Sequence, residues 1–341
     1  MLGLFKKQLK AGLDIGQDSL KYILLDEGRG IIHYGREEKN FPGREKKDDI
    51  LAGERLKEKL KSFLSVCQKE CSAFSDNVNT AIHCEDTICQ YIDLPKLTKK
   101  EMDVAVPSRA IKYIPFPMDT VNLSYITVPS IKKEENKTGI FFVAAQKKSV
   151  EDMKNMLEQC GLQIENMCSP VLSLVREWSK NHGLKDNFYV LVHTGFCMTY
   201  VIILQDRYPY YFREFSTGGR DFTYAIQMGE QISWKEAEGY KMSYDATEKD
   251  ISMEPFMIKW LDEVKKSLEF FNKQFRSQSI SINKVFLSGG TALMKGLDSR
   301  LSEYINIPVI SDTWNRIKID TKFTGSLEPV KFKLVSGLAL T

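Results

Sequence analysis

The chain has 341 residues and a formal net charge of +3, and 43% of its residues are hydrophobic and 27% charged. This length suits one large or two moderate domains, and the composition is ordinary for a soluble globular protein. The small net charge does not indicate a nucleic-acid-binding face, and no apolar run approaches the roughly 20 residues of a membrane span. The first ten residues, MLGLFKKQLK, are too rich in lysine for a signal peptide. We expect a solvated terminus there, with a small amphipathic turn on a membrane surface as the alternative.

The first third of the chain predicts three strands, a helix and a fourth strand. Alternating apolar residues punctuated by glycine predict strands over residues 11–14, 20–25 and 31–34. A charged helix is expected over residues 50–70, and a strand over residues 79–82. The short turn in AGLDIGQDSLKYILL raises the question whether it is built to hold phosphate or is an ordinary hairpin.

The middle of the chain, residues 85–165, is predicted to form a distinct module. Thr98 with Glu101 forms a capping box that opens a helix, and Pro107 is expected to kink or shorten that helix. The alternating run VNLSYITV, residues 121–128, and the apolar run GIFFVAAQ, residues 139–146, predict an exposed and a buried strand.

Two further helices follow this module. Ser149 is expected to cap a helix that Gly161 ends. Ser169 is expected to cap the next helix, with Pro170 at its first position.

The second half of the chain repeats the first. Strands are expected over residues 189–193, 198–204 and 210–215, again with tight turns. Ser233 and Glu236 form a second capping box, which opens a helix. One apolar stripe predicts a long core helix; it consists of Phe256, Trp260, Leu261, Val264, Leu268, Phe271 and Phe275.

The last part of the chain predicts a strand, a Gly-Gly turn and a helix over KVFLSGGTALMKGL, residues 284–297. The ending LVSGLAL, residues 334–340, is expected to pack on the core as a strand or a helical turn.

The seven cysteines contain no C-x-x-C pair, which fits a reducing cytoplasm better than a disulfide framework. His83, Cys84 and Cys89 lie close together, and Cys67 and Cys71 are one helical turn apart. A metal site needs better spacing, so we interpret these cysteines as small buried hydrophobic residues.

The first hairpin turn has the elements of a phosphate loop. Gly16 permits a close approach to backbone N–H groups, Ser19 adds a hydroxyl donor and Lys21 a cation. Asp14 would hold Mg²⁺, through water, next to the phosphates. D-x-G alone is a weak signal, and an ordinary hairpin is the alternative.

Further glycine turns at Gly218-Gly219 and Gly289-Gly290 favour the phosphate-loop interpretation, because their order along the chain allows all of these turns to converge on one cleft. Glu238 and Lys241 share one helix face and suit hydrogen bonds to a ribose or a base edge. A solvated helix pair is the alternative for these two residues.

The order of these motifs resembles the PilM family of type IV pilus assembly proteins, which is related to the cell-division protein FtsA in the actin-like ATPase superfamily. The resemblance covers nearly the whole chain, from about residue 10 to residue 341, and KYIPFPMDTVNLSY, residues 112–125, is its most specific stretch. It implies an α/β fold that is actin-like (ribonuclease H-like), with two lobes of mixed sheets flanked by helices. It also implies ATP and Mg²⁺ in the cleft between the lobes, and an extra subdomain of the FtsA and PilM type.

The resemblance also assigns residues to subdomains and to the nucleotide site. The subdomains are residues 1–84 with 166–186 for the first lobe, 85–165 for the extra subdomain, 187–225 with 283–341 for the core of the second lobe, and 226–282 for its helical, nucleoside-binding part. The implied first phosphate loop contains Asp14, Gly16, Gln17 and Ser19; the second contains His193, Thr194 and Gly195; the nucleoside side contains Gly218, Gly219, Glu238, Lys241, Gly289 and Gly290.

The second loop departs from the D-x-G of the superfamily, because it reads His193-Thr194-Gly195. A neutral imidazole is a poor Mg²⁺ ligand and does not readily replace a carboxylate base, although a protonated His193 suits a phosphate. We therefore expect that ATP binding survives and that hydrolysis is weak or lost. The alternative is a hydrogen-bonded strand-end histidine in a cleft that binds nothing.

The resemblance implies a cytoplasmic scaffold, peripheral to the inner membrane, that binds the short N-terminal peptide of a PilN-like bitopic membrane protein. Strand addition to VNLSYITV is compatible with such binding. Other pilus platform proteins, motor ATPases, and a ring or other homo-oligomer are further expected partners. The alternatives are an active ATPase or kinase, an FtsA-like division protein, and a type II secretion platform component. FtsA-like chains end in an amphipathic membrane helix, and the ending SGLALT leads us to expect none here.

Overall fold

The computed structural model describes residues 9–39, 53–83, 87–131, 136–185, 187–248, 252–275, 280–323 and 325–341. The amphipathic turn expected within residues 1–10 therefore lies mostly outside the described residues, as does Cys84. The chain divides into two compact units. The first unit contains Met1–Ile82, Lys154–Gly183 and Thr313–Thr341, and the second unit contains His83–Met153 and Leu184–Asp312.

The first unit is built on a six-stranded sheet with the order β14-β3-β2-β1-β4-β8. The strands β1, β2 and β3 are antiparallel, whereas β4 and β8 continue the sheet in parallel. Nearly every residue of β1 and β2 is buried, which agrees with their largely apolar sequence. The strands are β1 Leu9–Ile15, β2 Ser19–Asp26, β3 Ile31–Lys39, β4 Asn77–Ala81, β8 Gln163–Cys168 and β14 Lys318–Ile319.

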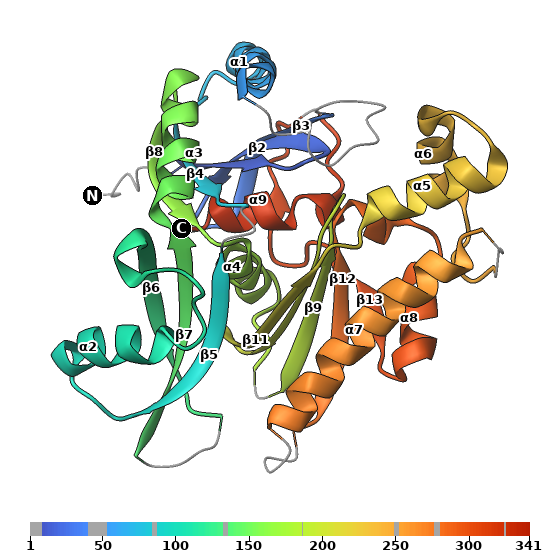
Figure 1. The fold of residues 1–341 in the computed structure, drawn as a ribbon. Helices are drawn as coiled ribbons and strands as arrows, with labels where there is room; N and C mark the ends of the chain where they lie inside the picture. The colour runs from blue at the N-terminus through green and yellow to red at the C-terminus, as the bar shows by residue number, and fades with distance from the viewer. Residues whose placement is uncertain are drawn as a thin grey trace. The chain divides into compact units, whose positions relative to one another are not determined.

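Helices complete the first unit (Figure 1). Ser169 caps α4 through its hydroxyl, and Pro170 is the first helical residue, as predicted. The apolar ending of the chain forms the short helix α9, which packs against α4 and β1. The helices are α1 Gly53–Glu70, α4 Pro170–His182, the 3-10 turn η5 Pro329–Lys331 and α9 Lys333–Leu338, while α3 Lys147–Gln159 crosses the boundary between the units.

The C-terminal segment is integral to the first unit. Lys333 and Glu177 are fully buried and form an ion pair of 3.0 Å between α9 and α4. Gly12 of β1 permits α9 to lie close, because a Cβ atom there would stand 2.4 Å from the carbonyl oxygen of Val335. The subdivision expected from the sequence counts residues 313–341 with the second lobe, whereas their contacts lie in the first unit. The four-part subdivision itself stays a prediction.

The second unit repeats the same strand plan in a five-stranded sheet with the order β11-β10-β9-β12-β13. Again three antiparallel strands are followed by parallel ones, which confirms the predicted repeat. The strands are β9 Phe188–Thr194, β10 Thr199–Gln205, β11 Tyr208–Phe215, β12 Ile282–Ser288 and β13 Val309–Ser311.

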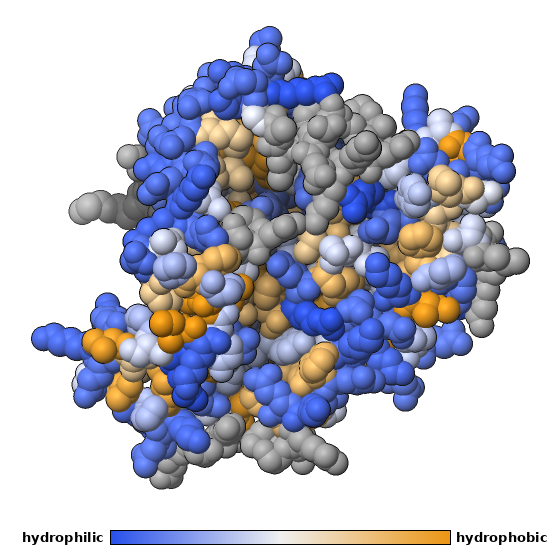
Figure 2. All heavy atoms as spheres, in the orientation of Figure 1, coloured by the Kyte–Doolittle hydropathy of each residue, from blue (hydrophilic) through white to orange (hydrophobic). Residues whose placement is uncertain are grey.

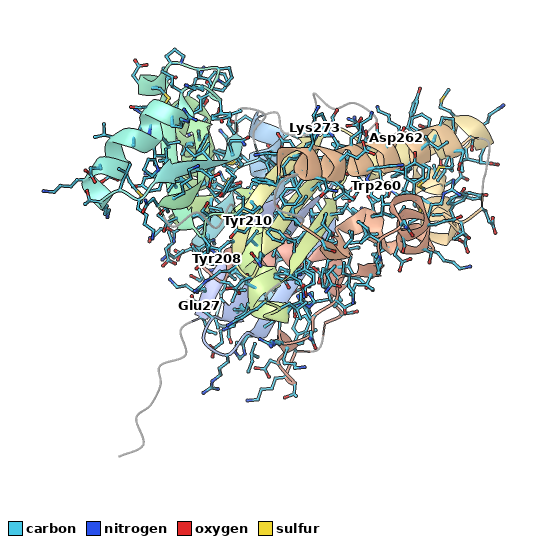
Figure 3. All side chains as sticks on the ribbon, turned by 90° about the horizontal axis from the view of Figure 1, so that it is seen from below. Glu27, Tyr208, Tyr210, Trp260, Asp262 and Lys273 are labelled. Carbon is cyan, nitrogen blue, oxygen red and sulfur yellow. The ribbon has the colours of Figure 1, made fainter. Side chains whose placement is uncertain are left out.

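The helices of the second unit include the predicted long core helix. Trp260 of α7 is fully buried and donates from its indole Nε1 to the hydroxyl of Thr199 (3.1 Å), so this face of the helix packs on the sheet (Figure 3). The helices are α5 Gly219–Glu230, α6 Trp234–Ser243, α7 Glu254–Gln274, the 3-10 turn η4 Gly290–Leu293 and α8 Leu297–Ile305.

A three-stranded sheet with the order β5-β7-β6 lies in the same unit and corresponds to the predicted middle module. Its helix α2 covers one face and closes a small core that includes Val106 and Phe142. The elements are β5 Ile88–Pro95, α2 Lys99–Ala110, the 3-10 turn η2 Met118–Thr120, β6 Val121–Val128 and β7 Lys137–Gln146.

Most predicted helix boundaries are confirmed, and two are wrong. Both capping boxes, Thr98 with Glu101 and Ser233 with Glu236, are present. The helix α3 does not start at Ser149, because it follows directly on β7 and begins at Lys147.

The Gly-Gly turn also differs from its prediction, because a single 3-10 turn follows it and α8 begins only after Gly296. The helix α2 runs three residues past Pro107, which lies in its last turn.

Candidate functional site

The turn between β1 and β2 is closed by a hydrogen bond from the amide of Gly16 to the carbonyl of Ser19 (3.0 Å). Asp14, at the end of β1, lies opposite Lys21 of β2 in the strand register. The two side chains form an ion pair of 3.6 Å, and the ammonium of Lys21 also donates to the hydroxyl of Ser19 (2.8 Å). The structure therefore brings together the predicted residues of this loop, with Gln17 half-buried at its tip.

Glu37 of β3 is a member of this cluster that the sequence did not reveal. It accepts a hydrogen bond from Ser19 (2.9 Å), lies 3.7 Å from Lys21 and pairs with Lys331 at 3.1 Å. Burial by itself would raise the pKa of Glu37, but the ammonium groups of Lys21 and Lys331 outweigh it and lower the pKa. The hydroxyl and the cation predicted for phosphate thus have partners within the protein.

The turn between β9 and β10 has the same geometry, because the amide of Gly195 donates to the carbonyl of Met198 (2.9 Å). His193 holds the position equivalent to that of Asp14 and is 8% exposed. Its Nδ1 lies 3.0 Å from the hydroxyl of Ser288, and its ring stacks on that of Tyr200 with centroids 6.2 Å apart. Where the first loop pairs Asp14 with Lys21 across its two strands, the second loop therefore pairs His193 with Tyr200.

The glycine turns of the second unit meet at this loop. The carbonyl of Gly195 accepts hydrogen bonds from the amide of Gly219 (2.9 Å) and from the hydroxyl of Thr291 (3.1 Å). Gly289 has a φ of 94°, and a Cβ atom there would stand 2.2 Å from the carbonyl oxygen of Thr194. The buried Thr194, Gly195, the Gly218–Gly219 turn and Gly289 therefore form one contiguous cluster.

Gly290 differs from its neighbour, because it is exposed and a Cβ atom there would meet no other atom within 4 Å. The backbone at Gly290 is thus open to approach from outside. This is the kind of position where a ligand can lie directly against the main chain.

The predicted pair Glu238 and Lys241 of α6 lies beside these turns. Lys241 is buried and donates to Glu238 (2.7 Å), to the hydroxyl of Thr223 (2.7 Å) and to the carbonyl of Gly219 (3.2 Å). Its ammonium therefore fixes α6 against the start of α5. Thr223 is a further residue of this group that the sequence did not single out.

The candidate residues fall into two groups, one in each unit. The first unit contributes Asp14, Gly16, Gln17, Ser19 and Lys21, and the second contributes His193, Thr194, Gly195, Gly218, Gly219, Glu238, Lys241, Gly289 and Gly290.

Among the residues that the structure describes, no group of three or more His, Cys, Asp or Glu side chains is arranged to hold a metal ion. Burial raises the pKa of the Cys67 thiol to about 12 and also raises the pKa of Cys71. Both thiols are therefore protonated at neutral pH and behave as small core residues.

A family model of the type IV pilus assembly protein PilM matches residues 12–341. The chain belongs to this family. The match runs through the hairpin loops, the middle module and α9, and it confirms the family that the sequence resembles.

Solved structures agree with the family. A chain of a PilM–PilN type IV pilus biogenesis complex has a TM-score of 0.80 and 23% identity, with 98% of both chains covered. The ethanolamine utilization protein EutJ from Carboxydothermus hydrogenoformans has a TM-score of 0.60 and 14% identity, covering 100% of this chain and 92% of that one. MreB5 of Spiroplasma citri, bound to ADP, has a TM-score of 0.54 and 11% identity, covering 96% and 94%.

These neighbours share the actin-like ATPase fold, which confirms the predicted fold class. The PilM-family chain is an actin-like protein of type IV pilus assembly. No helix within the described residues is sufficiently long and apolar to traverse a bilayer.

Proposed function

We propose that this PilM-family chain is a cytoplasmic adaptor at the inner-membrane platform of the type IV pilus, which binds the N-terminal peptide of a PilN-like membrane protein. The observation that carries the proposal is the likeness over 98% of both chains to a chain of a PilM–PilN complex, together with the family match over residues 12–341. Binding of ATP with Mg²⁺ is a second part of the proposal. Binding to motor ATPases or to other platform proteins, and assembly into a ring or other homo-oligomer, stay predictions.

The strand β6 offers an edge for an extended peptide. In the order β5-β7-β6 it pairs with β7 alone among the described strands. Asn122, Ser124 and Ile126 are exposed along it, so one row of side chains is open to a partner. A peptide that adds to such an edge gains main-chain hydrogen bonds, and its alternate side chains read the neighbouring surface.

Titration of the purified chain with a synthetic peptide of the partner's N-terminal residues tests this part. We expect Ile126→Asp to weaken binding about tenfold, because a carboxylate would lie in the peptide contact. Ile310→Asp is the matched control, since Ile310 lies on the edge strand β13 and is 38% exposed against 37% for Ile126. Equal affinities of the two variants would place the peptide away from β6.

The glycine cluster of the second unit supports nucleotide binding. The open backbone at Gly290 suits a nucleoside, and Glu238 is placed at the same cluster through Lys241 and Gly219. MreB5, which shares the fold, is bound to ADP in its structure. Asp14 of the first unit is the residue we propose for Mg²⁺, held through water; its carboxylate is buried beside the ammonium of Lys21.

Calorimetry with ATP and Mg²⁺ tests this part. We expect Gly290→Ala to weaken binding about tenfold by obstructing the ligand, while leaving the fold intact. Gly239→Ala on the neighbouring helix α6 is the control, because its Cβ atom also meets nothing within 4 Å. Asp14→Ala should remove the Mg²⁺ dependence. If the folded wild-type protein gives no heat of binding with ATP and Mg²⁺, the nucleotide part of the proposal is wrong and the adaptor works without nucleotide.

His193 leads us to propose that hydrolysis is weak or lost. Its imidazole is held by Ser288 and Tyr200, and it supplies no carboxylate for Mg²⁺ or for an attacking water. Phosphate release from ATP should stay near background for the wild type and rise in His193→Asp. Rapid release by the wild-type protein would instead support the alternative, an active ATPase or kinase.

A further inference from the structure

The outer face of α2 carries the most exposed large hydrophobic side chain among the described residues. Val104 is 69% exposed, and Ile111, just after the helix, is 55% exposed. The two positions are seven residues apart, about two helical turns, so their side chains lie in one line. Tyr113 follows at 43% exposed. The inner face is buried in the core of the module through Met102, Val106 and Ala110.

Exposed cations lie along this segment. Lys100 lies one turn before Val104 on the same face, Lys112 directly follows Ile111, and Lys96 precedes the helix. Lys99 and Arg109 are also exposed, but they lie about 140° around the helix from Val104. None of these five side chains pairs with a carboxylate of a described residue. In α1, by contrast, Lys57 and Lys59 each pair with a glutamate.

The two carboxylates of the same segment, Glu101 and Asp103, offset two of these five positive charges. Glu101 is engaged in the capping box and accepts from the amide of Thr98 (2.8 Å). Asp103 accepts a hydrogen bond from the phenol of Tyr125 (2.6 Å). The segment therefore presents an excess of positive charge in a chain whose total net charge is only +3.

We propose that this face of α2 rests on the anionic surface of a lipid bilayer. Val104 and Ile111 would enter the headgroup region, and Lys96, Lys100 and Lys112 would lie against lipid phosphates. Exposed apolar side chains aligned among lysine and arginine are the composition of helices that lie in a membrane interface. In the view of Figure 2, hydrophobic atoms stand among hydrophilic ones over the place of α2 in Figure 1.

A second apolar surface lacks this charge pattern. Met228 of α5 is 61% exposed and Tyr240 of α6 is 43% exposed, but their neighbours include Glu230 and Glu236. Acidic residues are repelled by an anionic leaflet. This surface therefore serves as the internal control for the proposal.

The lipid contact goes beyond the proposed peptide binding, because it needs no protein partner. Each cation near an anionic surface strengthens binding about fivefold, and two or three shallow apolar side chains add little more. We therefore expect weak binding that is lost at an ionic strength of about 1 M, where the Debye length falls to about 3 Å. Together with a partner peptide, such a contact would fix the orientation of the module on the membrane.

Flotation of the full chain with vesicles tests the proposal without any partner protein. We expect binding to vesicles that contain phosphatidylglycerol and none to vesicles of phosphatidylcholine alone. The double variant Lys100→Glu/Lys112→Glu should lose at least about tenfold in binding. The control Lys235→Glu/Lys259→Glu changes the net charge equally at exposed positions of α6 and α7 and should lose less than about threefold.

Val104→Ser, compared with Met228→Ser, separates the apolar contribution from the charge, and circular dichroism verifies that each variant is folded. Absence of wild-type binding to anionic vesicles, or equal losses in the two double variants, would overturn the proposal. Self-association of the wild type that Val104→Ser abolishes, without lipid binding, would assign this face to a second copy of the chain instead. Because the vesicles contain no protein, a failure of peptide binding would not change these results.

Discussion

The two β-hairpin turns that begin the two large sheets share their backbone geometry but are stabilised differently. In the first, Asp14 lies opposite Lys21, and Glu37 and Lys331 extend the pair into a row of alternating charges. In the second, His193 lies opposite Tyr200 and beside Ser288, and close backbone contacts through Gly195 and Gly289 join the loops. The same strand arrangement is therefore stabilised by ion pairs at the first turn and by close packing of glycines at the second. We expect the first turn to be sensitive to loss of a charge and the second to be sensitive to an added methyl group.

The largest expected effect is that of Gly289→Ala in the second unit. The new methyl would require both a positive φ and a contact of 2.2 Å with the carbonyl oxygen of Thr194. We expect a loss of about 3 kcal/mol in unfolding free energy from strain and overpacking. Hydrogen exchange should show the loss in β9 and β12.

The neighbouring change Gly290→Ala is the control, because its methyl meets no atom within 4 Å. It should change the free energy of unfolding by less than about 0.5 kcal/mol. A similar loss in both variants would mean that the second loop does not depend on close packing at Gly289.

A smaller effect is expected for Lys21→Met in the first unit. The change removes the cation between Asp14 and Glu37, whose side chains are 8% and 20% exposed. We expect a loss of about 2 kcal/mol, between the values for exposed and fully buried ion pairs, measured by urea denaturation.

Lys57→Met is the matched control in the same unit, because its partner Glu54 is 85% exposed. It should cost less than about 0.5 kcal/mol. If both substitutions cost the same, ion pairing would not be what distinguishes the first loop.

The smallest effect is a change in acid sensitivity for Glu37→Gln. The lowered pKa of Glu37 in the folded protein means that its contribution to stability is complete above the unfolded pKa of about 4.5. This contribution is lost as the pH falls from there through the lowered pKa.

The urea midpoint of the wild type should therefore fall more steeply than that of Glu37→Gln as the pH is taken below about 4.5. The two curves should run parallel above about pH 6. Parallel curves throughout would mean that Lys21 and Lys331 do not stabilise the ionised form of Glu37.

The strand plan and most helix boundaries could be predicted from the sequence, because they depend on local signals. Thr98 with Glu101, Ser233 with Glu236, and Ser169 before Pro170 each mark a helix start within a few residues. Ser149 misled the prediction, because the continuous chain from β7 into α3 leaves no place for a capping residue there.

The members of the loop clusters were harder to predict, because they depend on register and on distant segments. Glu37 faces Lys21 only through the pairing of β3 with β2, which contains a shift between Leu24 and Leu25. Lys331 comes from the other end of the sequence. In contrast, Glu238 and Lys241 lie one turn apart on a single helix, so their pairing could be read locally.

The placement of α9 has a consequence for the order in which the chain folds during synthesis. The first unit is made of three segments, and the third, Thr313–Thr341, supplies α9 and the buried Lys333 that pairs with Glu177. About 130 residues separate this segment from the end of the second one, so at ribosomal speed it emerges roughly 7–26 seconds later. The second unit is by then fully synthesised, whereas Glu177 and the face of β1 at Gly12 await their partners. The unit that begins first along the chain is therefore the last to complete its core.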